Sequence, residues 1–340
     1  MAHVATITID HTKVPGDLTD YVGLIVPDGS AGYSALYALC LEGGGDIRLF
    51  KSDDTTELAR EIVSFSVSAE TGEIHYKYSG TLSSSVDTDI HVYADGSSSD
   101  YAVGATYGRN NVWVDYLFVA HDGGGTDSTG NVTPTANGGV IAGGVTGQIG
   151  VATDFDGSND NFDLGDLDSS SLTVSAWANV DTKQNQYIAS KYTGASATRS
   201  WILRYDGSNW EFDVIQSSGA FSVAEWPDSS PVGDYRYIVG VYDNSGNDGF
   251  LYVDGVERAT SSPDSLNQTN TTVKVGSHGA GGSEWDGEID EVRIKETPDS
   301  ANWITTEYNN QNSPTTFYSV AAVAGSSAAQ AARRGVIMMM

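Results

Sequence analysis

The sequence predicts an all-β protein with two tandem β-sandwiches and an extended carboxy-terminal tail. Its 39 glycines and 8 prolines separate many short apolar runs, a pattern typical of brief strands joined by turns. Apolar periodicity of the helical kind is nearly absent. A chain of 340 residues is too long for one small sandwich, so its length favours two domains.

The first predicted domain covers residues 1–110 and is a β-sandwich of unknown function. Apolar and polar side chains alternate over residues 73–78, as in a sheet with one buried face. The aromatic residues of this domain are therefore assigned to its core. The strands predicted here are 4–9, 21–26, 47–51, 61–67, 73–78 and 89–93.

The second predicted domain covers residues 111–310 and follows a junction rich in Gly, Ser, Asp and Asn. Asp206-Gly207 and Asp254-Gly255 mark two hairpins, because Asp-Gly suits a type I′ turn. Only residues 300–308 have a helical pattern, with Ser300 as the N-cap. The strands predicted here are 112–120, 152–155, 172–180, 187–191, 200–205, 210–216, 235–242, 250–253, 256–260, 272–276 and 287–294.

The remaining residues, 311–340, differ in composition from the rest of the chain. They contain no acidic residue, two arginines at Arg333 and Arg334, and an Ala/Ser/Gly run that ends in apolar residues. Such a composition fits a disordered tail. It also fits a low-complexity docking tail that lies on an acidic neighbour or in a groove, and this second interpretation predicts self-assembly.

Charge excludes several classes of partner. Lys+Arg 17 against Asp+Glu 45 gives 17 − 45 = −28, a net charge that repels phosphate backbones and anionic membranes. We therefore expect no nucleic-acid partner, and no apolar run is long enough for membrane insertion. The same charge attracts cations such as calcium, although solubility in a salty medium explains it equally well.

The single cysteine and the start of the chain bear on where the protein works. Cys40 permits no intrachain disulfide and is interpreted as a small buried thiol. No basic segment followed by an apolar run is seen at the start of the sequence. We expect a location in a virion or on an extracellular surface, reached without a classical signal peptide, with the cytoplasm as the alternative.

Several segments of the second domain resemble a laminin-G-like, concanavalin A-like jelly roll, of the kind common in bacterial and phage proteins. Each is weak alone, but together they keep the family's order over about two hundred residues. The segments are YLFVAH (116–121) with DSTGN (127–131), ATDFDGSND (152–160), LTVSAW (172–177), LYVDG (251–255) and GEIDEVRI (287–294). The resemblance implies that this domain is the jelly-roll sandwich.

The first third is similar to a bacterial and phage domain of unknown function that often precedes such modules. The matching segments are ITID (7–10), DIRLF (46–50) with SDD (52–54), REI (60–62) and DTDIHVY (87–93). The tail matches neither family.

The laminin-G-like resemblance implies a structural calcium ion. Carried over by position, Asp290 supplies a carboxylate, and Asp127, Ser128 and Asn131 supply oxygens from a loop, which are the hard ligands that calcium prefers. From Glu288 onward the sequence alternates, which predicts that Asp290 shares a face with Val292. The alternative is an Asp290 satisfied only by backbone amides.

The same fold occurs in laminarinase-type glycoside hydrolases, whose motif places carboxylates at alternate strand positions. Here Glu288 and Asp290 fit, but Val292 occupies the third position. Asp154, Asp156 and Asp160 form another acidic cluster, but Asp156-Gly157 and Asn159-Asp160 fit turns, and the histidines are scattered along the sequence. We therefore expect no catalytic residues and no enzyme, with a glycoside hydrolase as the least favoured alternative.

Binding of sugars requires exposed aromatic faces beside polar loops. Trp177 lies in a strand of the family's core pattern and is assigned to the core. Four other tryptophans lie near turns and are the candidate ligand-binding residues: Trp201, Trp210, Trp226 and Trp285. Trp226 is the first choice because Pro227 and the polar residues after it interrupt the strand.

Two functions remain open. The first is a non-enzymatic, virion-associated or surface structural protein with a calcium-containing, lectin-like domain that binds glycan or host surface polysaccharide. The second is a decoration or cement protein that assembles with itself or with other virion or surface proteins through its sandwiches and tail, without binding sugar. The fold alone does not decide between them.

Overall fold

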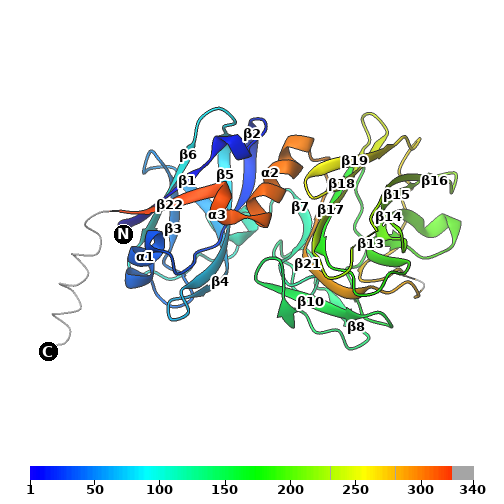
Figure 1. Cartoon of the computed structure of the whole chain (residues 1–340), viewed down its shortest axis with the longest axis horizontal. Coiled ribbons are helices and arrows are strands. Elements are labelled where there is room, and N and C mark those ends of the chain that lie inside the picture. The colour runs from blue at the N-terminus through cyan, green and yellow to red at the C-terminus, as the bar shows by residue number, and fades with distance from the viewer. Residues whose placement is uncertain (230, 280, 324–340) are drawn as a thin grey trace, which may run out of the picture. The chain divides into compact units, whose positions relative to one another are not determined.

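The computed structural model describes residues 1–229, 231–279 and 281–323, which form two compact units (Figure 1). Unit 1 consists of Met1–Val114 together with the chain from Asn309 onward. Unit 2 consists of Asp115–Tyr308. Residues 324–340 of the predicted docking tail lie outside the described residues. None of the helices in the described ranges is long and apolar enough to cross a membrane.

Unit 1 contains seven antiparallel strands in the order β2-β5-β4-β3-β6-β1-β22. The strands are β1 (Ala2–Ile9), β2 (Leu18–Ile25), β3 (Arg48–Lys51), β4 (Glu57–Ser66), β5 (Thr71–Leu82), β6 (Thr88–Ala94) and β22 (Tyr318–Ala322). Alternation predicts one buried face for β5, but Glu73 and His75 are buried as well as Ile74 and Tyr76. The indole of Trp113, which donates to Glu61, packs at a tilt against the His75 ring and helps to cover that second face.

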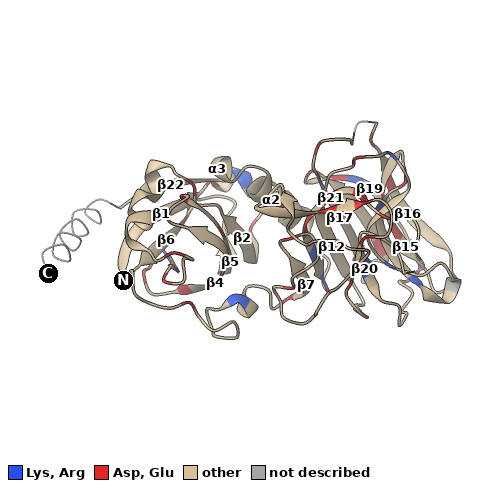
Figure 2. Cartoon of the chain, turned by 90° about the horizontal axis from the view of Figure 1, so that it is seen from below, with Lys and Arg blue, Asp and Glu red and all other residues tan. Residues whose placement is uncertain are grey.

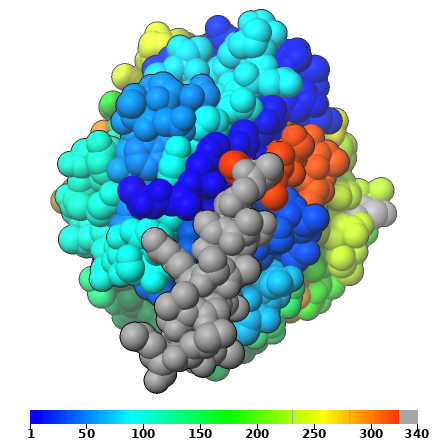
Figure 3. Space-filling view, turned by 90° about the vertical axis from the view of Figure 1, so that its left-hand side faces the viewer, coloured from blue at the N-terminus to red at the C-terminus, as the bar shows by residue number. Residues whose placement is uncertain are grey.

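The last described strand returns to the first one. β22 pairs antiparallel with β1, with Ile9 opposite Tyr318 and Ala5 opposite Ala322, so it lies beside the amino-terminal strand (Figure 3). Phe317 and Tyr318 are buried in unit 1. The sequence segment 311–323 is therefore folded as the end of a helix, a short helix and an edge strand.

The helices are few. The predicted helix at 300–308 is α2 (Ala301–Asn312), and the Ser300 hydroxyl accepts a hydrogen bond from Trp303 N at 3.2 Å, as expected for an N-cap. Two short helices, α1 (Ser34–Leu39) and α3 (Pro314–Phe317), were not predicted. Single 3₁₀ turns lie at His11–Lys13, Ala31–Tyr33, Arg109–Asn111 and Ser196–Thr198.

Unit 2 is a sandwich of two antiparallel sheets. Sheet A has the order β19-β18-β17-β12-β21-β10-β9, with β7 also paired to β21, and sheet B has the order β16-β15-β14-β13-β20-β11-β8. The strands of sheet A are β7 (Tyr116–Ala120), β9 (Val145–Thr146), β10 (Val151–Asp156), β12 (Leu172–Ala178), β17 (Arg236–Asp243), β18 (Asp248–Val253), β19 (Val256–Ser261) and β21 (Asp286–Lys295). Those of sheet B are β8 (Thr135–Asn137), β11 (Asn161–Asp163), β13 (Gln186–Tyr192), β14 (Arg199–Tyr205), β15 (Asn209–Ile215), β16 (Phe221–Pro227) and β20 (Val273–Val275).

The prediction of an all-β architecture is confirmed, and every predicted strand overlaps an observed one. The strands that sequence reasoning missed are β8, β9, β11, β16 and β22, most of them short or polar. The hairpin at Asp254-Gly255 has positive φ at both central residues, 53° and 72°, as a type I′ turn requires.

The main core of unit 2 lies between the two sheets, and α2 covers part of the outer face of sheet A. Trp177, Tyr237 and Tyr252 form an aromatic layer on that outer face, against which Ile304 and Tyr308 of α2 pack. Within the described residues, no such helix is found on the outer face of sheet B. Acidic residues greatly outnumber basic residues along the chain, as the red and blue segments of the ribbon show (Figure 2).

Candidate functional site

The loop predicted to bind calcium is closed by Asp127 itself. Asp127 is buried, and its Oδ1 accepts hydrogen bonds from Val119 N at 3.2 Å, Thr129 N at 3.0 Å and the Thr129 hydroxyl at 2.9 Å. Its Oδ2 accepts from Val132 N at 2.8 Å and from the same hydroxyl at 2.7 Å. A carboxylate offers about four lone-pair sites. Donors therefore contact both carboxylate oxygens, and Asp127 closes the loop through these hydrogen bonds.

The other two loop residues fasten the same loop to β7. Ser128 N donates to the carbonyl of Val119 at 2.8 Å, and the Asn131 amide donates to the carbonyl of Tyr116 at 3.2 Å. Both contacts use donors, so they stabilise the path of the loop and do not require an ion. A calcium ion at this loop stays a prediction from family resemblance.

Asp290 lies on the opposite face of its strand from the one predicted. Ile289 and Val292 both belong to the core between the sheets, although they are three residues apart. The register of β21 shifts in its pairing with β12, and Glu291 has φ of 51°, which identifies a β-bulge. The predicted shared face of Asp290 and Val292 is therefore wrong, because the bulge interrupts the alternation.

Asp290 is fully buried on the outer side of sheet A, opposite Trp177 in the ladder. Its Oδ2 accepts a hydrogen bond from Ile149 N at 2.8 Å. A Cβ placed on Gly147 would lie 2.4 Å from the same oxygen, so the turn before β10 packs directly on the carboxylate. Asp290 thus holds this turn through the backbone amide of Ile149.

Next to the bulge lies a buried ionic network. Arg293 Nη2 lies 2.5 Å from Glu291 Oε2, and its Nη1 contacts Glu307 of α2. The Tyr237 hydroxyl donates to Glu307 at 2.5 Å, and His121 Nδ1 lies 2.6 Å from Glu291. The charges compensate one another, which indicates a structural role in joining α2 to sheet A.

Four carboxylates face one another across β10 and β21. Asp154 lies opposite Glu288, and Asp156 lies opposite Asp286. Partial burial and the charges of Asp181 and Asp286 raise the pKa of Asp154. Burial and the charges of Asp181 and Asp154 raise that of Glu288. We call Asp154, Asp156, Asp286 and Glu288 the acidic ladder.

Asp156 and Asp160 also confirm the turn chemistry predicted for them. Asp156 Oδ1 accepts from Ser158 N at 2.9 Å, which closes the turn after β10.

Three of the four candidate tryptophans are buried in the core. Trp210 and Trp285 have no exposed surface and Trp201 has 2%, so these side chains offer no face to a ligand in solution. Their assignment to a ligand site is corrected on this ground: they sit near turns in sequence but point between the sheets.

Trp226 is half-buried. It pairs with Trp210 across β15 and β16 and packs on the core, and the Arg258 guanidinium lies 4.6 Å from its ring centre. The arginine therefore covers part of the ring, and Pro227 ends β16 directly after it.

The outer face of sheet B carries an aromatic cluster that sequence reasoning missed. Tyr187 and Tyr192 lie edge-on to His278, with ring centres 5.1 and 5.5 Å apart, and Tyr192 lies 6.4 Å from Phe221. Arg199 lies 5.2 Å from the Tyr192 ring and 5.5 Å from Phe221. We call these five residues the aromatic face.

The aromatic face is open to solvent at one end. Phe221 is 40% exposed and its neighbour on the same side of β16, Val223, is 39% exposed, whereas Tyr187 is nearly buried. An apolar side chain left exposed beside aromatic rings and a guanidinium is suited to stacking on a ligand. The sequence gives only a weak signal for this cluster, because its five residues come from three strands and a loop that are far apart in the chain.

Beside the aromatic face lies a carboxylate pair on β15. Glu211 Oε2 and Asp213 Oδ2 lie 2.5 and 3.1 Å from Arg204 Nη2, and Arg204 lies over the Tyr187 ring. Burial raises the pKa of Glu211 to about 7 and that of Asp213 to about 6, against the opposing effect of Arg204. Carboxyl groups with raised pKa values are candidates for acid–base chemistry. Here Asp213 is fully buried and shares one guanidinium with Glu211, which favours a structural ion pair.

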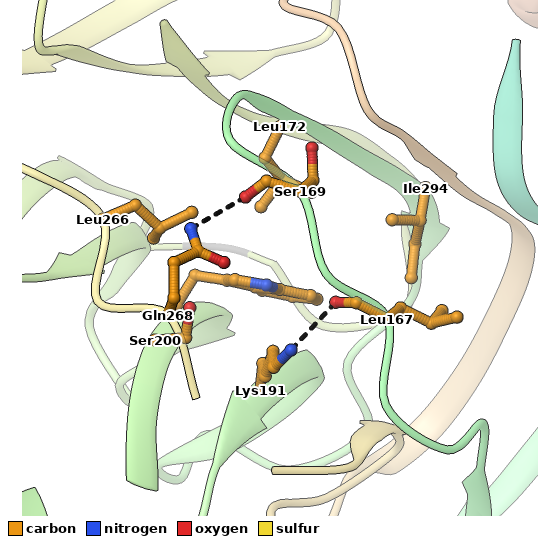
Figure 4. A pocket seen from close by; sticks show the side chains of 9 residues that line it. Leu167, Ser169, Leu172, Lys191, Ser200, Leu266, Gln268 and Ile294 are labelled. Carbon is orange, nitrogen blue, oxygen red and sulfur yellow. Dashed lines mark hydrogen bonds between the residues drawn. The ribbon is translucent and has the colours of Figure 1, made fainter. Parts of the chain in front are cut away.

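A small cavity near the edge of the two sheets is too small for a sugar. Its volume is about 10 Å³, room for roughly one water molecule. Lys191 Nζ donates to the carbonyl of Leu167 at 3.0 Å, and the Gln268 amide donates to that of Ser169 at 2.9 Å, so polar contacts close the cavity (Figure 4).

The family model that matches this chain describes the concanavalin A-like lectin/glucanases superfamily and covers residues 155–305. The match lies within unit 2, whose two sheets have the expected sandwich arrangement. Unit 2 contains a concanavalin A-like domain. A search of curated proteins found no match.

Three solved structures are similar to part of this chain. The receptor-binding domain of botulinum neurotoxin type G has 16% identity and a TM-score of 0.47, with 58% of this chain and 51% of that chain covered. The botulinum neurotoxin serotype D binding domain has 13% identity and a TM-score of 0.47, with coverages of 58% and 52%. The binding domain of Paraclostridial Mosquitocidal Protein 1 has 13% identity and a TM-score of 0.45, with coverages of 58% and 52%. The chain thus spans about half the length of these structures.

Proposed function

We propose that the concanavalin A-like domain of unit 2 binds carbohydrate without catalysing a reaction, and that the aromatic face is its binding site. The observation that carries this proposal is the exposed Phe221 ring beside Tyr192 and Arg199. Aromatic rings stack on the apolar faces of sugars, and guanidinium groups donate to their hydroxyls.

The position of the aromatic face supports this choice over the tryptophans predicted from the sequence. Three of those tryptophans are buried, and Arg258 covers part of Trp226. In contrast, Phe221 and Val223 stand on edge strand β16, where no further strand of sheet B covers them. A glycan chain can therefore approach along this edge.

Hydrolysis of the bound glycan is the competing function, because Glu211 and Asp213 lie next to the aromatic face. A hydrolase needs two carboxyl groups that both reach the scissile bond. Asp213 is fully buried, and both carboxylates form ion pairs with Arg204. This arrangement favours a structural role, in which the two carboxylates hold Arg204 in place, over a catalytic role.

We propose further that the protein acts at a virion or extracellular surface, where it attaches to polysaccharide. The net charge of −28 supports this setting by disfavouring nucleic acid and anionic lipid as partners. We assign calcium, as a partner of this domain, to the acidic ladder and not to the Asp127 loop, because the ladder carboxylates lie opposite one another whereas hydrogen-bond donors contact both oxygens of Asp127.

A glycan array on the full chain tests the proposal, first with calcium and then with excess chelator. We expect Phe221→Ala and Tyr192→Ala to weaken binding to any positive glycan at least about tenfold, the usual effect of losing a central aromatic contact. Ile141→Ala is the matched control, because Ile141 is an exposed apolar residue of unit 2 outside the aromatic face.

Other outcomes separate the alternatives. Loss of binding in Trp226→Ala but not in Phe221→Ala would move the site to the predicted tryptophan. Release of reducing ends that stops in Glu211→Gln would identify a hydrolase. A folded protein that binds no glycan would contradict the proposal and favour a decoration or cement protein.

A further inference from the structure

We propose that unit 1 binds a divalent transition-metal ion such as Zn²⁺ through His3, Asp54 and His91. One ring nitrogen from each histidine and one carboxylate oxygen of Asp54 lie within 4.8 Å of one another. A single ion with metal–ligand distances of about 2 Å can bridge three such atoms. The site lies in unit 1 and does not depend on the proposed function of unit 2.

A β-bulge places His3 on the same face as His91. In the ladder of β1 and β6, Thr6 lies opposite His91, so regular pairing would put His3 opposite Ala94. The register shifts between His3 and Ala5, and His3 lies opposite Tyr93 instead. Since Tyr93 and His91 are two residues apart, they share a face, and the bulge brings His3 onto it. The two imidazole rings then lie next to each other, with centres 4.3 Å apart and planes tilted by 31°.

The third residue comes from the hairpin between β3 and β4. Asp54 has φ of 58°, a left-handed conformation that Asp tolerates better than most residues. Its neighbour Asp53 closes the hairpin by accepting from Thr55 N and Thr56 N, each at 2.8 Å. Asp53 thus fixes the turn, and Asp54 is directed toward His91, whose Nδ1 lies 2.5 Å from Asp54 Oδ1.

The hydrogen bond of His3 leaves one of its nitrogens available to a metal. His3 Nε2 lies 3.0 Å from the carbonyl of Ala5, which can only accept, so the hydrogen is on Nε2 and the lone pair is on Nδ1. A backbone carbonyl of this kind orients histidines in metal sites. Asp54 Oδ1 accepts from His91 Nδ1 and from Tyr93, so an ion bound by both Asp54 and His91 Nδ1 would replace the hydrogen between these two atoms.

The donor set selects the class of metal. Two imidazoles with a carboxylate suit Zn²⁺, Cu²⁺ or Ni²⁺, whereas Ca²⁺ and Mg²⁺ prefer oxygen ligands alone. The Asp54 side chain is 50% exposed and that of His91 is 15% exposed, so an ion can enter from solvent. Three protein ligands leave a fourth position for water or for a group from another molecule.

The chain contains a matched control in the same unit. His11 and Asp87 form an exposed histidine–aspartate pair with Nδ1 and Oδ1 2.6 Å apart. Only one imidazole is present there, and the neighbouring Asp10 carboxylate accepts from the Thr12 backbone and hydroxyl. This pair should not bind a transition metal tightly.

Titration calorimetry of the full chain with Zn²⁺ tests the site, with Co²⁺ absorption as a second readout of nitrogen ligation. We expect His91→Ala and His3→Ala each to lose one equivalent of zinc or to weaken its binding at least about tenfold. His11→Ala should bind as the unchanged protein does. Circular dichroism without metal shows whether each variant is folded, and His91→Gln replaces His91→Ala if the latter is not.

The proposal is overturned if the unchanged protein binds no zinc. It is equally overturned if folded His3 and His91 variants bind zinc with the original stoichiometry and affinity, because the ion would then lie elsewhere.

Discussion

Ile9 of β1 lies opposite Tyr318 of β22, so a strand from beyond unit 2 pairs with the first strand of unit 1. Unit 2 is therefore an insertion between β6 and β22 in the topology of unit 1, and unit 1 is incomplete without residues that follow position 308.

The contribution of β22 to stability can be measured by changing Phe317, the fully buried residue directly before this strand. Phe317→Ala should lower the free energy of unfolding of unit 1 by about 3–5 kcal/mol, the usual cost of removing a buried phenyl ring. Chemical denaturation followed by tryptophan fluorescence measures it. Ser319→Ala, at an exposed position of β22, is the control and should have little effect.

Truncation extends the same test. A chain that ends after Val323 keeps the paired strand and should retain the stability of unit 1, whereas one that ends after Ser313 should lose it. Equal stability of the two truncated chains would mean that the sheet does not depend on β22.

Arg293 compensates two buried carboxylates in unit 2. Arg293→Met should destabilise unit 2 by about 3–5 kcal/mol, because Glu291 and Glu307 would lose their shared guanidinium. Thermal unfolding measures the change. Arg258→Met removes an exposed arginine from β19 and should cost less than about 1 kcal/mol. A similar small loss in both variants would show that the buried network is not needed for stability.

The acidic ladder should make unit 2 less stable as the pH rises. The pKa of Asp154 is raised in the folded state, so the fold binds its proton more tightly than the unfolded chain does. The contribution of Asp154 to the free energy of unfolding is therefore most favourable at acidic pH, and it is lost as the pH rises through the pKa of Asp154 in the folded state. Asp154→Asn cannot ionise, and it should be more stable than the unchanged protein at pH 7 by about 0.2–1 kcal/mol.

Thermal melts of this variant at pH 7 and pH 3.5 give the comparison. The advantage of Asp154→Asn should shrink at the lower pH, and Asp264→Asn, at an exposed position, should show none. A melting temperature lowered at pH 7 would contradict repulsion within the ladder and would indicate that Asp154 makes a favourable contact.

Glu211 gives a second pH dependence, in a higher range. Burial raises its pKa from the usual 4.5 to about 7, so the stability that protonated Glu211 provides is lost as the pH rises from about 4.5 to about 7. Glu211→Gln should flatten this part of the stability profile. Glu225→Gln, on the exposed position opposite in β16, should leave the slope unchanged. A profile that keeps its slope in Glu211→Gln would assign the dependence to another group, with Asp213 as the nearest.

Features decided by neighbouring residues could be predicted from the sequence. The all-β class, the type I′ turn at Asp254-Gly255 and the N-cap at Ser300 follow from periodicity and from the backbone preferences of single residues. The order of the motifs also indicated the jelly-roll domain, because several segments that are weak alone follow one another in the order of the family.

Contacts between distant segments were decided only by the tertiary structure. A bulge at Glu291 turns Asp290 away from the core between the sheets. A second bulge, between His3 and Ala5, places His3 on the same face as His91. In both cases one extra residue moves a side chain to the other face of the strand. Trp210 is buried because it points between the sheets, whereas Phe221 is exposed on the outer face of edge strand β16. The pairing of β22 with β1 depends on residues more than three hundred positions apart. Local periodicity carries no information about such pairings, because their free energy comes from packing and hydrogen bonds that exist only in the folded chain.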